Sequence, residues 1–479
     1  MARVSEYYGI GLTQGSLDFI DVDISGDTMV FVDPTALLTL RSDWGNECVA
    51  LVQDFFRTVL DHIHHNRHVE ARNLLSSLRE PNETHLGFSR GKARGRALGQ
   101  ESARDVWQSL RHSEAVQSGL LEDLEDTILM VEGIAYDIVS DITTNIIRQP
   151  LIHYSQMMCS DLGIPLIDGV SPGPLWDVVS KQWFVEFAAL PMTTAGKLLL
   201  VPKVIVRQRM IYNADEYYRH FLLPYLQEYE IQAGSSLVKL LKSGEPRVTK
   251  KSLQEKYGCG KSTIVRETLN HPEVLSRYRT AKRSRRIPPM SPEELSDATD
   301  SPEPNLQALL ADVEAVSPGS DGASSYHRSV EALLNALFYP ALVHPQRERE
   351  IHEGRKRVDI VYTNAATDGF FQWVSTHYPA ANIFVECKNY SEDPTNPELD
   401  QLAGRFSPSR GKVGILLCRY IENKELFLAR CRDTALDDRG YIIPLDDDDL
   451  RGLVVAGTAG SYSSRQFLIL KGLFDQLTM

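Results

Sequence analysis

Two short runs of strand-forming residues in the C-terminal third of the chain, 357–362 and 383–388, each carry an acidic residue. The first run reads Arg-Val-Asp-Ile-Val-Tyr and the second reads Ile-Phe-Val-Glu-Cys-Lys. Side chains alternate between the two faces of a strand, so Glu386 and Lys388 share one face. Glu386 directly follows three apolar residues, where an unpaired carboxylate would be costly to bury. The two runs therefore predict a sheet that brings Asp359, Glu386 and Lys388 to one polar site.

The composition divides the 479 residues into parts, and a chain of this length is expected to form two or three domains. Residues 246–286 hold twelve Lys or Arg against three Glu, a local charge of +9, although the whole chain carries −13. Residues 287–322 hold eight acidic residues, six prolines and no Lys or Arg, which predicts an acidic linker with at most a helical turn or two at 306–316. We therefore predict domains at 1–240 and 323–479, separated by the basic segment and the linker.

The periodicity of apolar residues predicts a multidomain α/β protein. The N-terminal part is expected to be mixed α+β and mostly helical, with a helix that begins at Pro34 and is capped by Asp33. The C-terminal part shows the order α, β, β, β, α, β, followed by a further α, β, α. Its expected elements are a helix at 325–338, strands at 341–343, 357–362 and 383–386, a helix at 397–406, a strand at 413–418, a helix at 424–436 and a strand at 441–445.

This order of elements, together with Asp359 and the triplet Glu386-Cys387-Lys388, resembles the PD-(D/E)xK, or restriction-endonuclease-like, nuclease superfamily. Asp359 matches the first acidic residue of the family, and the triplet matches its (D/E)-x-K motif. Val358 stands where the proline of the motif would be, a departure that many members share. The resemblance implies an αβββαβ core and hydrolysis of phosphodiester bonds.

Such hydrolysis requires a divalent metal ion that neutralises developing charge and lowers the pKa of the attacking water. Mg²⁺ prefers oxygen ligands, and Mn²⁺ is the alternative ion at such a site. Asp359, Glu386 and the carbonyl of Cys387 are the expected metal ligands, and Lys388 is expected to orient the water or stabilise the transition state. The alternative is that the acids only end their strands and that Lys388 is a solvated charge.

Two further residues match positions of the same family. Glu331, in the helix before the strands, matches an additional acidic position, and Gln401 resembles the helix glutamine of the Mrr-like branch. The resemblance therefore adds both to the catalytic set. For each, the alternative is an ordinary solvated position on a helix.

The basic segment reads as a helix-turn-helix, with helices at 250–256 and 261–269 and a turn at 257–260. Six apolar residues can form its core, while polar residues point outward to meet phosphates or base edges. The alternative is a basic, solvated helical hairpin. The expected nucleic-acid contacts are Lys251, Lys256, Lys261, Ser262 and Arg266.

A second basic stretch lies in the N-terminal part, where glycines recur every four residues from Gly87 to Gly99. Arg90, Lys92 and Arg94 lie between these glycines, and such a loop can wrap an anion with backbone amides and guanidinium groups. A disordered surface loop is the alternative.

These observations lead to two hypotheses. The first is a Mg²⁺-dependent DNA endonuclease of bacterial restriction or anti-phage defence, with RNA as an alternative substrate and a homodimer or partner proteins as the expected assembly. The second is a nucleic-acid-binding regulator or defence scaffold whose nuclease fold does not cut. Because the chain has no apolar run long enough for a membrane span and no signal peptide, we expect it in the cytoplasm without a membrane partner.

Overall fold

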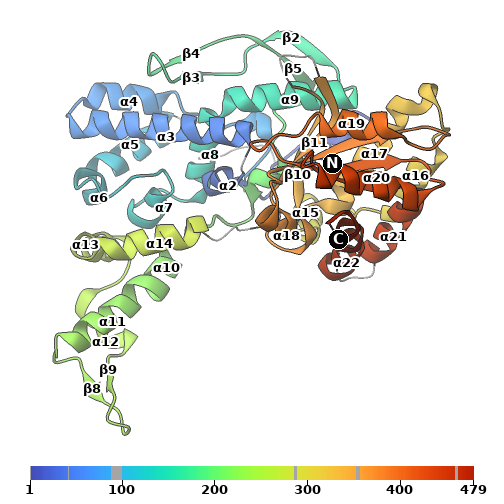
Figure 1. Ribbon diagram of the computed structural model, residues 1–479. Helices are drawn as coiled ribbons and strands as arrows, with labels where there is room; N and C mark the ends of the chain where they lie inside the picture. Colours follow the sequence, from blue (N-terminus) through green and yellow to red (C-terminus); the bar gives the residue numbers. More distant parts are fainter. Residues whose placement is uncertain are drawn as a thin grey trace.

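The computed structural model describes residues 2–40, 42–87, 100–284, 288–351, 356–458 and 462–478. The fold is mixed α/β, and its two larger hydrophobic cores lie in the N-terminal and C-terminal parts of the chain. Figure 1 shows the N-terminal helices grouped on one side and the C-terminal sheet with its helices on the other. Among the described residues, no helix has both the length and the apolar character needed to cross a membrane.

The N-terminal part is mostly helical, as predicted. Asp33 accepts a hydrogen bond of 2.9 Å from the backbone N–H of Thr35 and caps the helix that begins at Pro34, which confirms that local prediction. The helices are α1 (Val4–Tyr7), α2 (Pro34–Thr39), α3 (Asp43–His64), α4 (His68–Ser76), α5 (Gln100–His112), α6 (Glu114–Gln117), α7 (Asp126–Met130), α8 (Tyr136–Ile146), α9 (Arg148–Leu162), α10 (Ala214–Tyr217) and α11 (Leu223–Gln232). The single turns η1 (Asn82–Thr84), η2 (Lys203–Ile205) and η3 (Tyr218–Leu222) lie between them.

Short strands supplement these helices. β1 (Phe31–Val32) pairs with β7 (Val206–Arg207), and β3 (Leu175–Asp177) pairs with β4 (Gln182–Phe184). β2 (Leu166–Val170), β5 (Ala188–Thr193) and β6 (Gly196–Lys197) form a small antiparallel sheet in the order β2-β5-β6.

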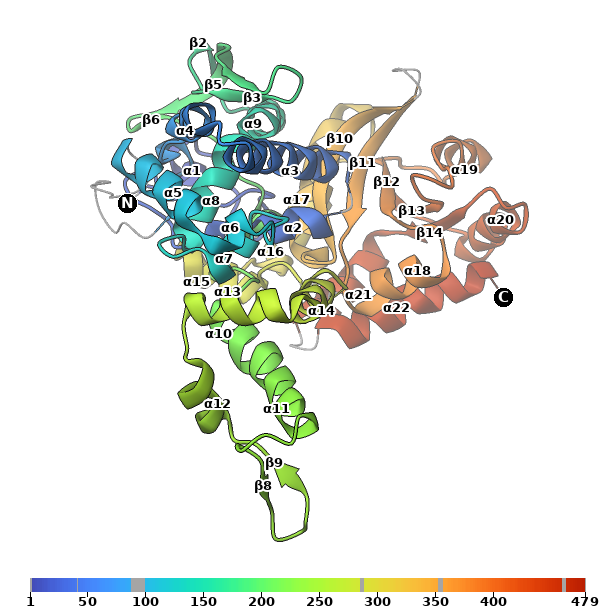
Figure 2. The ribbon, with the colours of Figure 1, turned by 90° about the vertical axis from the view of Figure 1, so that its left-hand side faces the viewer.

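The basic segment forms the hairpin β8 (Lys239–Leu240) and β9 (Pro246–Arg247), followed by α12 (Lys250–Tyr257), α13 (Lys261–Asn270) and α14 (Pro272–Ser284). The bounds of α12 and α13 agree with the two helices predicted for this segment to within about one residue. Together with α11, the hairpin and α12 project away from the rest of the molecule, as Figure 2 shows.

The acidic stretch 287–322, which we predicted to be a linker with at most a helical turn or two at 306–316, is more helical than expected. This stretch contains α15 (Pro292–Thr299), α16 (Leu306–Ala315) and the turn η4 (Ser320–Gly322). Leu295 of α15 is buried in the N-terminal core, whereas Leu306, Leu310 and Val313 of α16 are buried in the C-terminal core. These apolar residues at helical spacing bury enough surface to order the segment despite its acidic composition.

The C-terminal part contains a five-stranded sheet within the described residues, in the order β10-β11-β12-β13-β14. β11 runs antiparallel to both of its neighbours, β10 and β12, whereas β12, β13 and β14 run parallel to one another. The strands are β10 (Leu342–Ile351), β11 (Lys356–Asn364), β12 (Asn382–Lys388), β13 (Val413–Cys418) and β14 (Tyr441–Leu445). Every residue of β13 is buried, as expected for a central strand covered on both faces.

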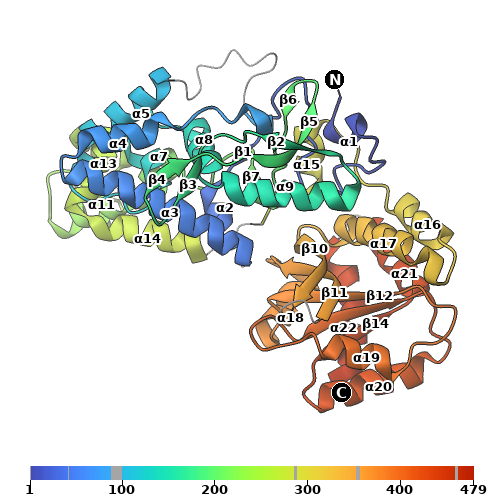
Figure 3. The same ribbon diagram turned by 90° about the horizontal axis from the view of Figure 1, so that it is seen from above.

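The helices of this domain are α17 (Ala323–Phe338), α18 (Gly369–His377), α19 (Asn396–Ala403), α20 (Lys424–Leu436), α21 (Asp447–Thr458) and α22 (Tyr462–Thr478). Figure 3 shows α16, α17 and α21 on one side of the sheet and α19 and α20 on the other. The predicted order of helices and strands is confirmed up to β14, except that α18, between β11 and β12, was not expected. After β14 two helices follow, α21 and α22, where one was predicted.

The two parts of the chain touch through α17 and β10. Asn335 donates a hydrogen bond of 3.0 Å to the carbonyl of Ser16, and the backbone N–H of His344 donates one of 3.1 Å to Asp18. The ammonium group of Lys203 lies 4.2 Å from the centre of the Tyr339 ring. The helix α17 therefore connects the N-terminal body with the sheet.

Candidate functional site

The predicted acidic residues meet where β11 and β12 separate. The described ladder between these strands runs to the pair Ile360 and Val385, and Asp359 and Glu386 are the next residues. There the Asp359 carboxylate accepts a hydrogen bond of 2.8 Å from the backbone N–H of Cys387. The side chain thus takes the place of a backbone acceptor and is fixed beside Glu386.

Glu386, Lys388 and Gln401 form a connected polar cluster beside Asp359. Lys388 Nζ donates a hydrogen bond of 3.0 Å to Glu386 Oε1 and one of 3.2 Å to Gln401 Oε1. Gln401 Nε2 also donates to Glu386 Oε1. Gln401 lies on α19, whose first turn is fixed by a capping box between Thr395 and Glu398. The structure therefore brings Asp359, Glu386, Cys387, Lys388 and Gln401 together.

Burial and neighbouring charges shift the pKa values of Glu386 and Lys388 in this cluster. The Glu386 side chain is 1% exposed, and burial, followed by the nearby charge of Asp359, raises the pKa of its carboxyl group. Burial alone would lower the pKa of Lys388, but the charge and hydrogen bond of Glu386 outweigh it and raise that pKa. Glu386 Oε2 is buried without a hydrogen-bond partner in the described part of the chain. A buried carboxylate oxygen left in this state is costly unless a cation or donor meets it.

His327 of α17 is a member of the site that the sequence did not indicate. Its Nε2 atom lies 3.2 Å from the carbonyl oxygen of Cys387 and 3.7 Å from Asp359 Oδ2. It precedes Glu331 by four residues and so lies one helical turn earlier on nearly the same face. This spacing from Glu331 was the signal in the sequence that could have indicated His327. It does not predict which turn of the helix contacts the strands.

The structure does not place Glu331 in the site. Its carboxylate pairs with Arg347 of β10, and Arg347 also donates a hydrogen bond of 3.1 Å to the carbonyl of Asp161 in the N-terminal part. Burial raises the pKa of Glu331 to about 7 although the charge of Arg347 opposes this shift. The last turns of α17 face the contact between the two parts of the chain, and no described hydrogen bond or ion pair joins Glu331 to the cluster, so its catalytic role stays a prediction.

The predicted nucleic-acid contacts divide into exposed and occupied side chains. Lys251 and Ser262 are exposed, and Lys251 is only loosely paired, at 4.0 Å, with Glu255. Lys256 pairs with Glu230, and Arg266, which is half exposed, donates to Glu267 and to the carbonyl of Tyr257. Arg90, Lys92 and Arg94 lie outside the described residues.

Lys261 contradicts the prediction that it points outward. Its ammonium group donates hydrogen bonds of 2.7 Å and 2.9 Å to the carbonyls of Val131 and Ile134. Burial lowers its pKa. The N-terminal end of α13 is thus bound to the N-terminal body, and Lys261 is not free to meet a phosphate.

Part of the +9 charge is also neutralised inside the molecule. Arg279 pairs with Asp126 and, at 2.7 Å, with Glu122, while Arg283 pairs with Asp123. These acids belong to the N-terminal part, so α14 joins the basic segment to that body, with Arg279 buried and Arg283 still about half exposed.

Comparison with known proteins adds little to the geometry. Residues 9–213 match a family model described as a domain of unknown function (DUF8370). No curated protein and no solved structure matches the chain. The family match lies in the N-terminal body, and the cluster around Asp359 and Glu386 falls outside it.

Proposed function

We propose that the C-terminal domain is a Mg²⁺-dependent DNA endonuclease of the PD-(D/E)xK kind, which hydrolyses phosphodiester bonds. The observation that supports this best is the buried Glu386 Oε2 atom, which has no hydrogen-bond partner in the described part of the chain and belongs to the same cluster as Asp359 and Lys388. The order of elements from α17 to β13 is compatible with the core of that superfamily.

A divalent cation fits the donors available at this position. Asp359, Glu386 Oε2 and the carbonyl oxygen of Cys387 would hold it, and all three are the oxygen donors that Mg²⁺ prefers. Among the described side chains, no three of the types His, Cys, Asp or Glu gather into a metal-binding group. Mg²⁺ needs fewer side chains than that, because water and substrate phosphates usually complete its coordination. When bound, the ion would supply charge neutralisation and a more acidic water.

The side chains around this position have separate roles in the proposal. An ammonium group has three N–H donors, and Lys388 uses two of them on Glu386 and Gln401. Among the described residues the third N–H has no hydrogen-bond partner, and we assign it to a phosphate oxygen or the attacking water. Gln401 is hydrogen-bonded to both Glu386 and Lys388 and so fixes their geometry. His327 lies beside the Cys387 carbonyl and the Asp359 carboxylate and helps to position these two oxygens.

We assign DNA binding to the exposed side chains of the basic segment, residues 246–286. Lys251 and Ser262 are open to solvent, and Arg266 is half exposed, whereas Lys256 and Lys261 already have protein partners. We infer non-specific, salt-sensitive DNA binding at this surface. A role in bacterial restriction or anti-phage defence, with RNA as an alternative substrate, belongs to the same proposal.

The test is nicking of a supercoiled plasmid by the full chain with Mg²⁺ or Mn²⁺. Wild type is compared with Asp359→Ala and Lys388→Ala, and with Asp368→Ala as a control at an exposed position of the same domain. The proposal expects cleavage by wild type and the control only. Equal cleavage by all four proteins would sink the site assignment. DNA binding with no cleavage under any condition would favour the alternative of a binding protein with an inactive nuclease fold.

A further inference from the structure

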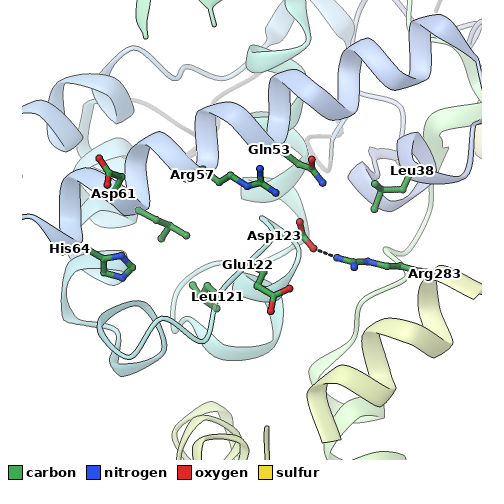
Figure 4. A pocket seen from close by; sticks show the side chains of 10 residues that line it. Leu38, Gln53, Arg57, Asp61, His64, Leu121, Glu122, Asp123 and Arg283 are labelled. Carbon is green, nitrogen blue, oxygen red and sulfur yellow. Dashed lines mark hydrogen bonds and ion pairs between the residues drawn. The ribbon is translucent and has the colours of Figure 1, made fainter. Parts of the chain in front are cut away.

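The N-terminal part contains a cleft of about 620 Å³ between α3, α2, the segment before α7 and the end of α14. Figure 4 shows Gln53 and Arg57 on α3 at one side of the cleft, and Asp123 with Arg283 across from them. Sites for small molecules usually have volumes of about 300–1,000 Å³. The cleft is therefore large enough for a ligand of the size of a nucleotide.

The charges that line the cleft are paired except for one. Asp123 pairs with Arg283, and Glu122 pairs with Arg279 at 2.7 Å. The third lining acid, Asp61, pairs with Arg67 and, at 3.0 Å, with His65. Each acid of the lining is thus already matched by a cation.

Arg57 is the remaining charge. It is exposed and has no hydrogen-bond or ion-pair partner among the residues that the structure describes. A guanidinium group presents a planar fork of donors that matches phosphate and carboxylate oxygens. Because the acids of the cleft are matched and Arg57 is not, the cleft offers an unpaired positive charge to an anion.

Gln53 and three leucines of the cleft are available to the part of the ligand that carries the anionic group. Gln53 lies one helical turn before Arg57 and has no hydrogen-bond partner in the described part of the chain, so its amide can both donate to and accept from a heterocycle. Leu38, Leu60 and Leu121 are the apolar residues of the lining, and Leu60 and Leu121 are themselves buried. We propose that this cleft binds a free mononucleotide, with its phosphate on Arg57 and its base near Gln53.

Isothermal titration calorimetry on the full chain tests this proposal. The titrants are AMP, GMP, CMP, UMP, inorganic phosphate and a short single-stranded oligonucleotide, all in EDTA so that the proposed metal site does not contribute. Wild type is compared with Arg57→Ala and with Arg72→Ala, which removes an exposed arginine from the neighbouring helix α4. The melting temperatures of both variants are measured to show that they fold.

We expect at least one mononucleotide to bind with a stoichiometry of one and more tightly than inorganic phosphate. Arg57→Ala should weaken that binding by about tenfold or more, the loss expected for a charge-assisted hydrogen bond, while Arg72→Ala leaves it unchanged. Gln53→Ala should reduce the differences in affinity among the four nucleotides. The proposal is overturned if no mononucleotide binds at up to about 1 mM, if Arg57→Ala binds as wild type does, or if the oligonucleotide is the tighter ligand at Arg57.

Discussion

Replacing Asp359 by Asn should stabilise the metal-free protein while it abolishes cleavage, because two carboxyl groups share one largely buried site. Burial and the charge of Asp359 raise the pKa of Glu386. A carboxyl group whose pKa is raised by folding favours the folded state at low pH, and this contribution is lost as the pH rises through its folded pKa. At a pH above its folded pKa, the ionised Glu386 therefore costs stability, and removal of the neighbouring charge relieves part of that cost.

The size of the effect follows from Coulomb's law. Two unit charges a few ångströms apart repel by about 2–4 kcal/mol at an effective permittivity of about 20. The Asp359 side chain is 21% exposed, and Lys388 lies 3.0 Å from Glu386, so solvent and the ammonium group screen much of the repulsion. We expect a net gain of about 1 kcal/mol, or about 2–4 °C in the melting temperature of a domain of this size. Asn retains a side-chain oxygen that can accept the hydrogen bond from Cys387.

Thermal unfolding of wild type and Asp359→Asn in EDTA and in Mg²⁺ measures this balance, with Asp368→Asn as the control. In EDTA the Asp359 variant should melt higher than wild type and the control. Mg²⁺ should then raise the melting temperature of wild type and the control but not of the Asp359 variant. A lower melting temperature for Asp359→Asn in EDTA would show that the Asp359 charge does not destabilise Glu386. An equal effect of Mg²⁺ on all three proteins would show that Asp359 does not hold the metal ion.

Three further predictions concern residues around the site and at the contacts between the parts. Burial raises the pKa of Glu331 from 4.5 to about 7. The protonated Glu331 should therefore increase the free energy of unfolding at low pH, and this contribution should disappear as the pH rises to about 7. Glu331→Gln should remove this dependence, as denaturant unfolding at about pH 5 and about pH 8 will show. Lys261→Met should lower the free energy of unfolding by about 1–3 kcal/mol and leave the salt dependence of DNA binding unchanged. Lys251→Met should leave the free energy of unfolding unchanged and reduce the slope of the salt dependence of DNA binding by about 1. Gln401→Ala should slow plasmid cleavage about 10–100-fold without loss of fold, and wild-type rates from this variant would contradict its positioning role.

Much of the C-terminal domain could be predicted from sequence because local patterns specify it. The bounds of β13, α20 and β14 agree with the expected ranges, since each is an apolar or amphipathic run bounded by polar or turn residues. The side-chain cluster around Asp359 and Glu386 could also be predicted, because alternation on β12 fixes the face of Glu386 and Lys388. The unexpected helix α18 carries the apolar residues Phe370, Phe371 and Val374 in too short a stretch for the helical period to be clear.

The sequence was least informative where tertiary packing decides the outcome. Both His327 and Glu331 lie on α17, and the way in which this helix crosses the strands decides that the earlier turn reaches Asp359. Lys261 stands at the predicted helix start, but its contacts come from residues 131–134, which no local pattern connects to it.

The acidic linker shows the limit of arguments from composition. Eight acids and six prolines at 287–322 predicted at most a helical turn or two, yet the stripe of Leu306, Leu310 and Val313 at positions i, i+4 and i+7 folds α16 onto the C-terminal domain. Arg419 then holds the end of this helix through its bonds to the carbonyls of Val313 and Glu314. A few well-spaced apolar residues outweighed the average composition.

The most direct test of the proposed site is to locate a metal ion in it. Anomalous scattering from crystals of the full chain grown with Mn²⁺ would show where the ion binds. We expect a peak about 2.1 Å from Glu386 Oε2 and within ligand distance of the Asp359 carboxylate and the carbonyl oxygen of Cys387. Well-ordered β11 and β12 strands with no peak between these oxygens, at a Mn²⁺ concentration that supports cleavage, would contradict the account.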